Sequence, residues 1–309
     1  MGAVARLARA VVGIALAFSL AAPAAFAQSV VRVASKIDTE GALLGNMILE
    51  VLQAEGIRTV NRLQLGPTNI LRSAIVAGEI DIYPEYTGNG AIFYALTGDP
   101  AWRGAESGYA KIKALDAAKQ KLIWLQPAPA DNTWVIAVRK DVAAANGLAS
   151  MEDFARWART GGQVRLAASA EFVESPAALP AFQRAYDFTL SHAQILTLAG
   201  GNTAVTIRAA AEGISGVDAA MAYGTDGALA LLDLAVMTDP KKAQVVYAPA
   251  PVVRAAVLDK HPAIKEGLDP LFRSLDEATL RRLNARIAVE GENAHEVALD
   301  YLTSNGFLK

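Results

Sequence analysis

Five aromatic residues fall where ordered segments of this sequence end. They follow strand-like runs or lie in proline-containing stretches, and they are Tyr83, Tyr86, Trp134, Tyr223 and Tyr247. For a single ring, packing at the edge of a core with its polar end in water is the ordinary role. Several ring faces that converge on one cleft would attract a cation, because each face presents a negative quadrupole. A quaternary ammonium group, which makes no hydrogen bonds, would suit such a cage of rings.

The residues needed for metal or cofactor chemistry are scarce. The three histidines, His192, His261 and His295, have no second ligand-type residue at the spacing of a metal site. No phosphate-binding loop, nucleophile elbow or dinucleotide-binding glycine motif follows a strand-like run. We therefore expect neither a bound metal nor a cofactor.

Carboxylates supply the remaining chemical alternative. Asp81, Glu85 or Glu171 would act as general acid or base if the chain were a secreted enzyme that used a cleft between lobes. No nucleophile, metal or cofactor motif accompanies them, and acidic residues beside strand ends commonly cap turns or hydrogen-bond to backbone. Binding without catalysis is therefore the expected activity.

The segments that would position the rings alternate between strands and helices. The run VVRVAS (30–35) has the β-branched composition of a strand. The run LLGNMILEVLQAEG (43–56) has apolar residues at helical spacing and ends in Gly56, a C-cap residue. This order predicts an α/β protein.

Two segments of the chain follow one plan. Residues 63–90 and 196–227 each read as a strand ending in glycine, a Thr/Asn-capped helix, and a second strand that runs to a tyrosine. Strand-helix-strand units are common in α/β proteins, which is the ordinary explanation. If the similarity reflects two like lobes, each has a tyrosine at the carboxyl end of a strand, where open sheets bind ligands.

Two extended stretches with paired prolines, 122–141 and 245–258, are the expected connections between the lobes, with strands that the prolines interrupt. The lobes would then comprise 28–132 with 249–309, and 133–248. The chain beyond Lys260 reads as helical, with a capping box from Ser274 to Glu277 and a last helix ending at Gly306. We expect this region to pack on the first lobe.

Composition and the first 27 residues favour an exported globular protein. The chain has 309 residues, 53% of them hydrophobic and 19% charged, enough for one or two cores. Residues 1–27 combine Arg6 and Arg9, an apolar run over 10–22 and an Ala-Phe-Ala site, as in a secretory signal peptide. A membrane anchor is the alternative, but this run is shorter than the ~20 apolar residues of a spanning helix.

Charge and cysteine content narrow the partners. Loss of the leader would lower Lys+Arg from 29 to 27 against 31 Asp+Glu, a net charge of −4, which argues against nucleic-acid binding. Cysteine is absent, so the chain has no disulfide and no lipid-bearing cysteine at the cleavage point. We expect a periplasmic protein that is not a lipoprotein.

Six segments together resemble one protein family over essentially the whole mature chain. They are SKIDTE, LGNMILE, GEIDIYPEYTGNG, NTWVIAVRKD, AYGTDGALALLDL and YAPAPVVR. The sequence is similar to the periplasmic osmoprotectant-binding proteins of ABC importers, the glycine betaine/carnitine/choline-binding family. This resemblance implies a two-lobed periplasmic-binding-protein fold of type II, monomeric, whose cleft captures a quaternary amine for a membrane ABC permease.

The resemblance also implies a set of ligand-binding positions. It places an aromatic box and polar residues near the other end of the ligand, and the expected site comprises Lys36, Tyr86, Thr87, Asn89, Asn132, Trp134, Tyr223 and Tyr247. The residues alone leave open whether Tyr83 or Tyr86 faces the cleft. They also leave open whether the ligand is a quaternary amine or another small zwitterion or amino acid.

Three positions depart from the family pattern. Asn89 and Asn132 stand where many members have threonine and aspartate, and Ser175 stands where betaine-clamping members carry an arginine. A bidentate guanidinium is the strongest partner for a carboxylate. If Ser175 faces the cleft, the resemblance implies weak binding of glycine betaine through Lys36, Thr87 and Asn89.

Overall fold

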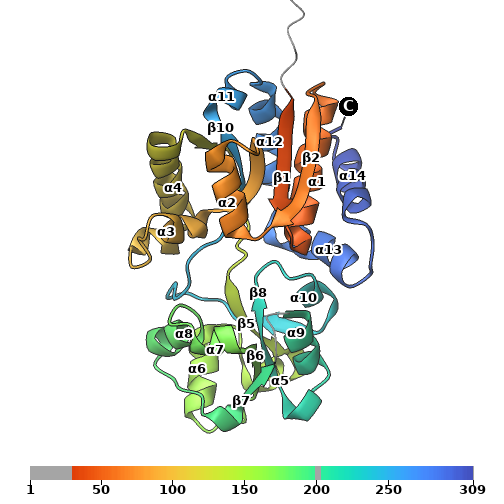
Figure 1. Cartoon of the computed structure of the whole chain (residues 1–309). Coiled ribbons are helices and arrows are strands. Elements are labelled where there is room, and N and C mark those ends of the chain that lie inside the picture. Colours follow the sequence, from red (N-terminus) through yellow and green to blue (C-terminus); the bar gives the residue numbers. More distant parts are fainter. Residues whose placement is uncertain (1–29, 199–202, 309) are drawn as a thin grey trace, which may run out of the picture.

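The protein is described by a computed structural model that covers residues 30–198 and 203–308, so the leader expected at 1–27 lies outside the described residues. These residues form two α/β lobes, each built on a five-stranded sheet, and Figure 1 shows one lobe above the other. The expected α/β fold with two lobes is confirmed.

The sheet of lobe 1 is mixed, in the order β2-β1-β3-β10-β4. Strand β1 runs parallel to β2 and β3, whereas β10 runs antiparallel to both β3 and β4. Its strands are β1 (Val31–Lys36), β2 (Thr59–Gly66), β3 (Ile82–Tyr86), β4 (Leu122–Trp124) and β10 (Pro249–Arg254). The carboxyl ends of β1 and β3 therefore meet at the edge that faces lobe 2.

The sheet of lobe 2 repeats this arrangement in the order β7-β6-β8-β5-β9. Strand β6 is parallel to β7 and β8, and β5 is antiparallel to β8 and β9. Its strands are β5 (Trp134–Arg139), β6 (Leu166–Ser169), β7 (Ile195–Leu198), β8 (Ala219–Tyr223) and β9 (Leu234–Val236). The two similar sequence segments thus occupy equivalent places, β2 to β3 in one sheet and β7 to β8 in the other.

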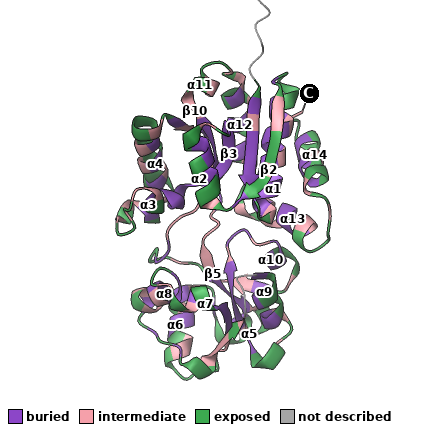
Figure 2. Ribbon diagram, viewed as in Figure 1, coloured by how far each residue is buried: buried purple, intermediate pink, exposed green. Residues whose placement is uncertain are grey.

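Helices cover both sheets. Those of lobe 1 are α1 (Thr39–Ala54), α2 (Thr68–Ala77), α3 (Gly90–Phe93), α4 (Ala105–Gln120), α11 (Ala255–Leu258), α12 (Ala263–Ser274), α13 (Glu277–Ala288) and α14 (Ala294–Ser304). Those of lobe 2 are α5 (Lys140–Asn146), α6 (Met151–Arg159), α7 (Ala170–Glu174), α8 (Leu179–Tyr186), α9 (Thr203–Ala211) and α10 (Ala228–Leu231). Figure 2 shows the buried residues on the strands and on the inner faces of these helices.

Helix α1 is the centre of the lobe 1 core. Asp38 begins it by accepting a hydrogen bond from Gly41 N at 2.7 Å, as an N-cap residue does. Leu44, Ile48 and Leu52 recur at helical spacing and are fully buried in one cluster with residues of α12, α13 and α14. Burial of each such side chain contributes about 1.5–3 kcal/mol. The C-terminal helices therefore pack on lobe 1, as expected.

Three local expectations are wrong. Helix α2 has no Thr or Asn cap, because its N-cap residue is Pro67, which makes no side-chain hydrogen bond. The capping box at Ser274 does not form, because Ser274 ends α12 and donates to Leu271 O, while Asp276 caps α13 through Thr279 N. The prolines do not interrupt β10. Pro251 lies directly opposite Pro84 of β3, so two residues without an N–H share one position of the ladder.

Two segments, 125–133 and 237–248, connect the lobes and bond to one another. Asn132 N donates to Tyr247 O at 3.1 Å, and Tyr247 N donates to the Asp131 carboxylate at 2.7 Å. Thr133 Oγ1 adds a bond of 2.7 Å to Val245 O. The crossing is therefore a paired ribbon rather than two independent loops.

A second contact between the lobes lies at α13. Arg281 Nε donates to Gly224 O of lobe 2 at 2.6 Å, and Asn284 Nδ2 donates to Thr225 O at 2.9 Å. Gly227, at the start of α10, lies so close that a Cβ atom there would be 2.6 Å from Ala285 Cα. Helix α13 of lobe 1 thus touches lobe 2 beside the crossing segments.

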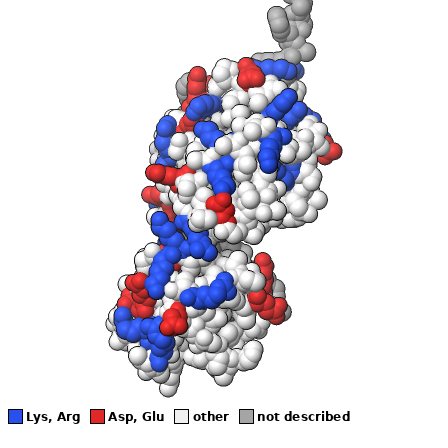
Figure 3. All heavy atoms as spheres, turned by 90° about the vertical axis from the view of Figure 1, so that its left-hand side faces the viewer, with Lys and Arg blue, Asp and Glu red and all other residues white. Residues whose placement is uncertain are grey.

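The exposed surface carries charges of both signs. In the view of Figure 3, Lys and Arg side chains gather near the junction of the lobes, and Asp and Glu side chains lie among them on both lobes. This mixture agrees with the small net charge of −2 for the whole chain.

Candidate functional site

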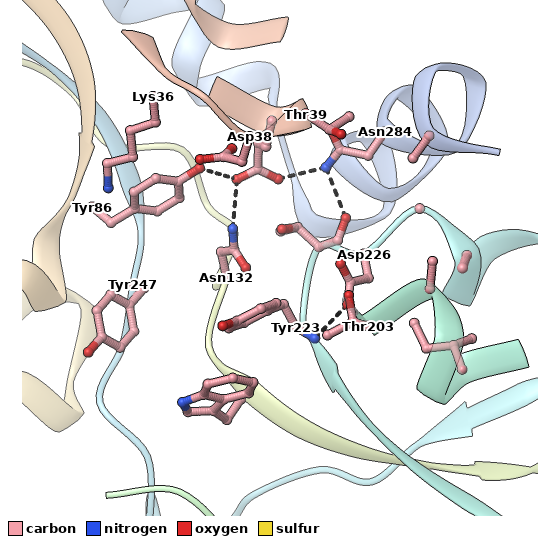
Figure 4. Close-up of a pocket in the computed structure, with 18 of the residues that line it drawn as sticks. Lys36, Asp38, Thr39, Tyr86, Asn132, Thr203, Tyr223, Asp226, Tyr247 and Asn284 are labelled. Atoms are coloured by element: carbon pink, nitrogen blue, oxygen red, sulfur yellow. Dashed lines mark hydrogen bonds between the residues drawn. The ribbon is translucent and has the colours of Figure 1, made fainter. Parts of the chain in front are cut away.

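A cleft of about 610 Å³ lies between the two sheets, beside the crossing segments. Its size is that of ordinary small-molecule pockets. Both lobes and both crossing segments line it, as Figure 4 shows for the labelled residues. Of the expected site residues, those that line this cleft are Lys36, Tyr86, Asn89, Asn132, Trp134, Tyr223 and Tyr247.

Trp134 and Tyr223 form the lobe 2 wall of the cleft. They are direct partners in the antiparallel pair of β5 and β8, so their side chains lie on the same face of the sheet. Their rings stack with centroids 4.2 Å apart and planes 25° apart. Phe172 supports Trp134 from behind in an edge contact of 5.3 Å. Sheet register therefore builds this half of the site.

Tyr86 and Lys36 come from neighbouring strand ends in lobe 1. Lys36 Nζ lies 4.3 Å from the centroid of the Tyr86 ring and 2.6 Å from Glu85 Oε1. The Tyr86 hydroxyl donates to Glu40 Oε1 at 2.8 Å. Burial raises the pKa of Tyr86, and the charge of Glu40 adds to this rise. The ammonium of Lys36 is thus balanced by a buried carboxylate before any ligand arrives.

The question of which tyrosine of YPEY faces the cleft has a clear answer. Tyr83 is fully buried in the core and donates its hydroxyl to Glu85 Oε2 at 2.9 Å. Tyr86 lines the cleft. Side chains alternate along a strand, so Glu85 lies on the same side as Tyr83 and pairs there with Lys36. Tyr86, at the end of the strand, points the other way, into the cleft.

Tyr247 enters the site from the second crossing segment. Its backbone is held by the bonds to Asp131 and Asn132 described above. Its ring packs on Gly88, where a Cβ atom would be 2.8 Å from the ring atom Cδ1. A glycine at 88 is therefore required for the ring to lie where it does.

The two asparagines are tied to carboxylates. Asn89 Nδ2 donates to Glu85 Oε1 at 2.7 Å, and Asn132 Nδ2 donates to Glu40 Oε1 at 3.2 Å. The other polar side-chain atom of Asn132, Oδ1, is buried and has no hydrogen-bond partner among the described residues. Asn132 therefore presents a free acceptor beside the cleft.

Thr87 does not line the cleft. It is 1% exposed, donates its hydroxyl to Val246 O and accepts from Ala248 N, both at 3.1 Å. The side chain points to the second crossing segment because its neighbour Tyr86 takes the cleft side. The side chain of Thr87 thus links β3 to the crossing segment and does not face the cleft.

Ser175 also lies outside the lining. It is the C-cap of α7, and its hydroxyl accepts from Ala177 N at 3.4 Å. The residue of α7 that lines the cleft is Glu171, one turn earlier. Helix α7 therefore presents an acid to the cleft, and the position of the implied clamp does not line it.

Several lining residues were not predicted from the sequence. Among the described residues, the charged lining consists of one base, the expected Lys36, and four acids. Glu171 was considered above for catalysis, whereas Asp38, Glu40 and Asp226 were not predicted. Asp38 carried one signal, its position as N-cap of α1. Asn284 carried none, because it reaches the cleft from α13, 244 residues after its partner Glu40. An excess of acids favours a ligand with a positive end.

The electrostatics of two of these acids follow from burial. Burial raises the pKa of Glu40, although hydrogen bonds that include those from Tyr86 and Asn284 oppose the rise. Burial likewise raises the pKa of Asp226, whose carboxylate accepts from Tyr223 N at 2.7 Å. Both groups are held at the cleft by neutral donors.

The carboxylates considered for catalysis differ in their surroundings. Asp81 binds Arg32 at 2.8 Å and Arg254 at 3.1 Å; burial alone would raise its pKa, but these hydrogen bonds hold it below the usual value. Glu85 is fully buried in its ion pair with Lys36. Both therefore have structural partners that account for them.

Neither a metal site nor a membrane-spanning helix is present in the described residues. Within 30–198 and 203–308, no group of three His, Cys, Asp or Glu side chains is arranged to hold a metal ion. In these ranges no helix has the length and apolar character needed to cross a membrane.

Comparison with known proteins gives the family. Residues 29–304 match the model of the OpuAC family, the substrate binding domain of the ABC-type glycine betaine transport system. The chain is 58% identical over 283 residues to the glycine betaine-binding protein YehZ of Escherichia coli, covering 92% of this chain and 93% of the relative. It is 31% identical to a glycine-betaine-binding protein of Pseudomonas aeruginosa, over 90% of this chain and 88% of the relative.

Structural comparison agrees. The structure of apo YehZ from E. coli superposes with a TM-score of 0.83 and covers 90% of this chain and 99% of that one. The chain therefore belongs to the OpuAC family of substrate-binding domains of ABC-type glycine betaine transport systems.

Proposed function

We propose that this chain is the solute-binding component of an ABC importer and that it captures glycine betaine or a related quaternary amine in the inter-lobe cleft. The observation that carries the proposal is the convergence of Tyr86, Trp134, Tyr223 and Tyr247 on one cleft whose charged lining is mostly acidic. The 58% identity to a glycine betaine-binding protein supports the same ligand class.

The chemistry of the cleft matches the two ends of such a ligand unequally. Ring faces and carboxylates attract a quaternary ammonium, each ring by about 0.5–2 kcal/mol when water is excluded. Among the described lining residues, a ligand carboxylate finds only Lys36 as a cation, and that ammonium is paired with Glu85. The ammonium end of the ligand therefore supplies most of the binding free energy. Glycine betaine binds weakly, because its carboxylate gains little.

A thermal-shift panel tests the ligand class. Glycine betaine, choline, carnitine and proline betaine are compared with amino acids, because a ligand that binds only the native state raises its stability by RT ln(1 + [L]/Kd). We expect stabilisation by quaternary amines and none by amino acids. Stabilisation by amino acids alone would replace the proposal with an amino-acid-binding protein of the same fold.

The proposal includes a division of the chain and a motion. We assign 28–132 with 249–309 to one lobe and 133–248 to the other, with the bond from Asn132 N to Tyr247 O at the boundary. Structures without ligand and with glycine betaine test this division. The rotation that relates them should pass through the crossing segments, and a rotation axis elsewhere would contradict it.

Cell location and partners follow from the same proposal. The chain acts as a periplasmic monomer, freed from a leader at 1–27 and without a lipid anchor, and delivers its ligand to a membrane permease. Mass spectrometry of the exported protein should give an unmodified N-terminus at Gln28, and light scattering should give the mass of a monomer. A retained leader or a dimer would contradict the corresponding part.

A further inference from the structure

One buried carboxylate in the cleft forms no ion pair within the described ranges 30–198 and 203–308. Glu40 lies in the first turn of α1, lines the cleft and is 5% exposed. It accepts hydrogen bonds from three neutral donors: Tyr86 Oη at 2.8 Å, Asn132 Nδ2 at 3.2 Å and Asn284 Nδ2 at 2.7 Å. Figure 4 draws these bonds as dashed lines from the labelled donors Tyr86, Asn132 and Asn284 to the two oxygens of one carboxylate. A β-strand end, a crossing segment and α13 thus all converge on this one group.

Nothing in the described part of the chain neutralises this carboxylate. Glu40 takes part in no ion pair there, and Lys36, the single base of the cleft lining, is 2.6 Å from Glu85 instead. An isolated charge is costly to bury, and a protein can avoid that cost by keeping the group protonated. The arrival of a cation in the cleft would remove the reason for protonation.

The surroundings of Glu40 can accommodate either protonation state. Asn132 and Asn284 direct Nδ2 to the carboxylate, while their Oδ1 atoms are buried with no hydrogen-bond partner in the part of the chain that the structure describes. Rotation of one amide would turn Oδ1 toward Glu40, where it could accept the proton of a carboxylic acid. The two side chains that bracket Glu40 are therefore donors to the charged form and available acceptors for the neutral form.

The other charged groups around Glu40 lie on its own helix α1, on β1, on α13 and in lobe 2. Asp38 adds a like charge from the N-cap of the same helix and raises the pKa of Glu40 further, after burial itself. The remaining groups already have partners: Lys36 of β1 with Glu85 of β3, Arg281 of α13 with Glu277 and Gly224, and Asp226 of lobe 2 with Tyr223 N. Neither Lys36 nor Arg281 is therefore available to pair with Glu40.

We propose that Glu40 is the counter-ion of the ligand's quaternary ammonium group and that it takes this role by losing a proton when the ligand binds. The O–H bond of the carboxylic acid breaks, the proton passes to the solvent buffer, and the carboxylate remains beside the cation. The inference rests on the proposed function, since it requires a cationic ligand in this cleft. It makes Glu40 a determinant of specificity for ligands with a fixed positive charge.

The sign of the pH dependence follows from linkage. Only the ionised form of Glu40 pairs with the cation, so affinity is low at acid pH and rises with pH through the titration of Glu40 in the free protein. On the acid side the affinity for glycine betaine should fall about tenfold per pH unit, and on the alkaline side it should be constant. Glycine betaine itself does not titrate between pH 5 and 9.

Calorimetry measures both signatures with the intact protein. Glycine betaine is titrated from pH 5 to 8.5 in two buffers of different ionisation enthalpy, which reports the number of protons released. We expect close to one proton on the sloping part of the affinity curve and none on its plateau. Binding with constant affinity and no proton release would overturn the inference while leaving the proposed function intact. No binding of any quaternary amine at any pH would overturn both.

Three variants identify the titrating group. Glu40→Gln should bind with an affinity that does not depend on pH and that is roughly tenfold or more below wild type at pH 8. Glu171→Gln, another glutamate of the lining, and Asp131→Asn, in the crossing segment, should keep the slope and the proton release. A slope that persists in Glu40→Gln would assign the proton elsewhere and overturn the inference.

A fourth variant keeps the test valid if Glu40→Gln does not fold. Tyr86→Phe removes one hydrogen bond to the ionised carboxylate, which raises the pKa of Glu40 in the free protein. The midpoint of the affinity curve should therefore move to higher pH with the slope preserved. An unmoved midpoint would contradict the role of Glu40.

Discussion

At the scale of single residues, several polar side chains of the site are already ion-paired or hydrogen-bonded to one another. Glu85 pairs with the ammonium of Lys36 and accepts a hydrogen bond from the amide of Asn89, and Glu40 accepts one from the hydroxyl of Tyr86. The ring faces of the lining and the buried Oδ1 of Asn132, an acceptor, remain open toward the cleft. Under the proposed function we therefore expect the positive end of a ligand to contribute more to affinity than its negative end.

Trp134 provides an optical test of the site. Ligand binding against its ring should change the intrinsic fluorescence of the wild type, and Trp134→Phe should lose most of that change. Trp102→Phe is the matched control, because Trp102 is fully buried in the core of lobe 1 with its indole N–H on Leu96 O. A ligand-induced change that survives Trp134→Phe would exclude this ring from the site.

The ring faces themselves can be tested at Tyr223 and Tyr247. Leucine keeps apolar bulk but has no quadrupole, so each substitution should weaken binding of a quaternary amine by about 0.5–2 kcal/mol. Urea unfolding of each variant checks that the fold is retained. Wild-type affinity in both leucine variants would contradict an aromatic cage.

The sequence located these rings because their positions are local features, strand ends and proline-broken stretches. It did not locate Glu40 or Asn284, because the bond between them joins α1 to α13 and depends on how the C-terminal helices dock. Thr87 illustrates a different limit. Tyr86 and Asn89 line the cleft, but the side chain of Thr87 between them points away and hydrogen-bonds to the crossing segment.

At the scale of elements, the repeated strand-helix-strand plan was readable from glycine caps and strand periodicity. Gly78 does end α2 in a left-handed conformation, φ 76°. The continuity of β10 was not readable, because it depends on Pro251 meeting Pro84 across the sheet. Local signals therefore identify elements, while pairing between distant strands decides where a proline is tolerated.

Gly227 tests the contact between α10 and α13. A methyl group there would lie 2.5 Å from Asn284 C, so Gly227→Ala must push lobe 2 away from α13. We expect weaker binding of glycine betaine and a larger radius of gyration by X-ray scattering. Gly98→Ala is the control, because a Cβ atom at 98 meets nothing within 4 Å. Equal affinity and equal dimensions for both variants would show that this contact does not set the angle between the lobes.

At the scale of the whole molecule, the crossing segments make the free energy of unfolding depend on pH. Asp131 lies in the first segment, accepts from Tyr247 N of the second, and borders a hollow lined also by Glu277. Burial raises the pKa of Asp131 to about 7, and the charges of Glu277 and Asp239 add to the rise. No feature of the sequence marked this residue, because its environment arises only when both segments and α13 meet.

The sign of the resulting stability change follows from this direction. A carboxyl group whose pKa is raised by folding contributes stability at pH values below its ordinary range of about 3.9, and that contribution is lost as pH rises through about 7. Asp81 behaves in the opposite way, since folding lowers its pKa and its contribution is lost only as pH falls toward the acid range. The free protein should therefore lose stability at both ends of the pH scale for different reasons.

Asp131→Asn separates the two ends. Asparagine keeps an oxygen to accept from Tyr247 N but cannot ionise, so the variant should match wild type near pH 4 and exceed it at pH 8. We expect a gain of about 1–2 kcal/mol at pH 8, less than the full pKa shift implies, because the side chain is half-buried and solvent screens it. Urea unfolding without ligand at both pH values measures the difference.

Asp81→Asn is the contrasting variant and should destabilise the protein at pH 8, because it breaks the ion pairs with Arg32 and Arg254. If Asp131→Asn lowers stability at pH 8, or changes it equally at both pH values, the carboxylate acts as a hydrogen-bonding link alone and the crossing segments do not sense pH.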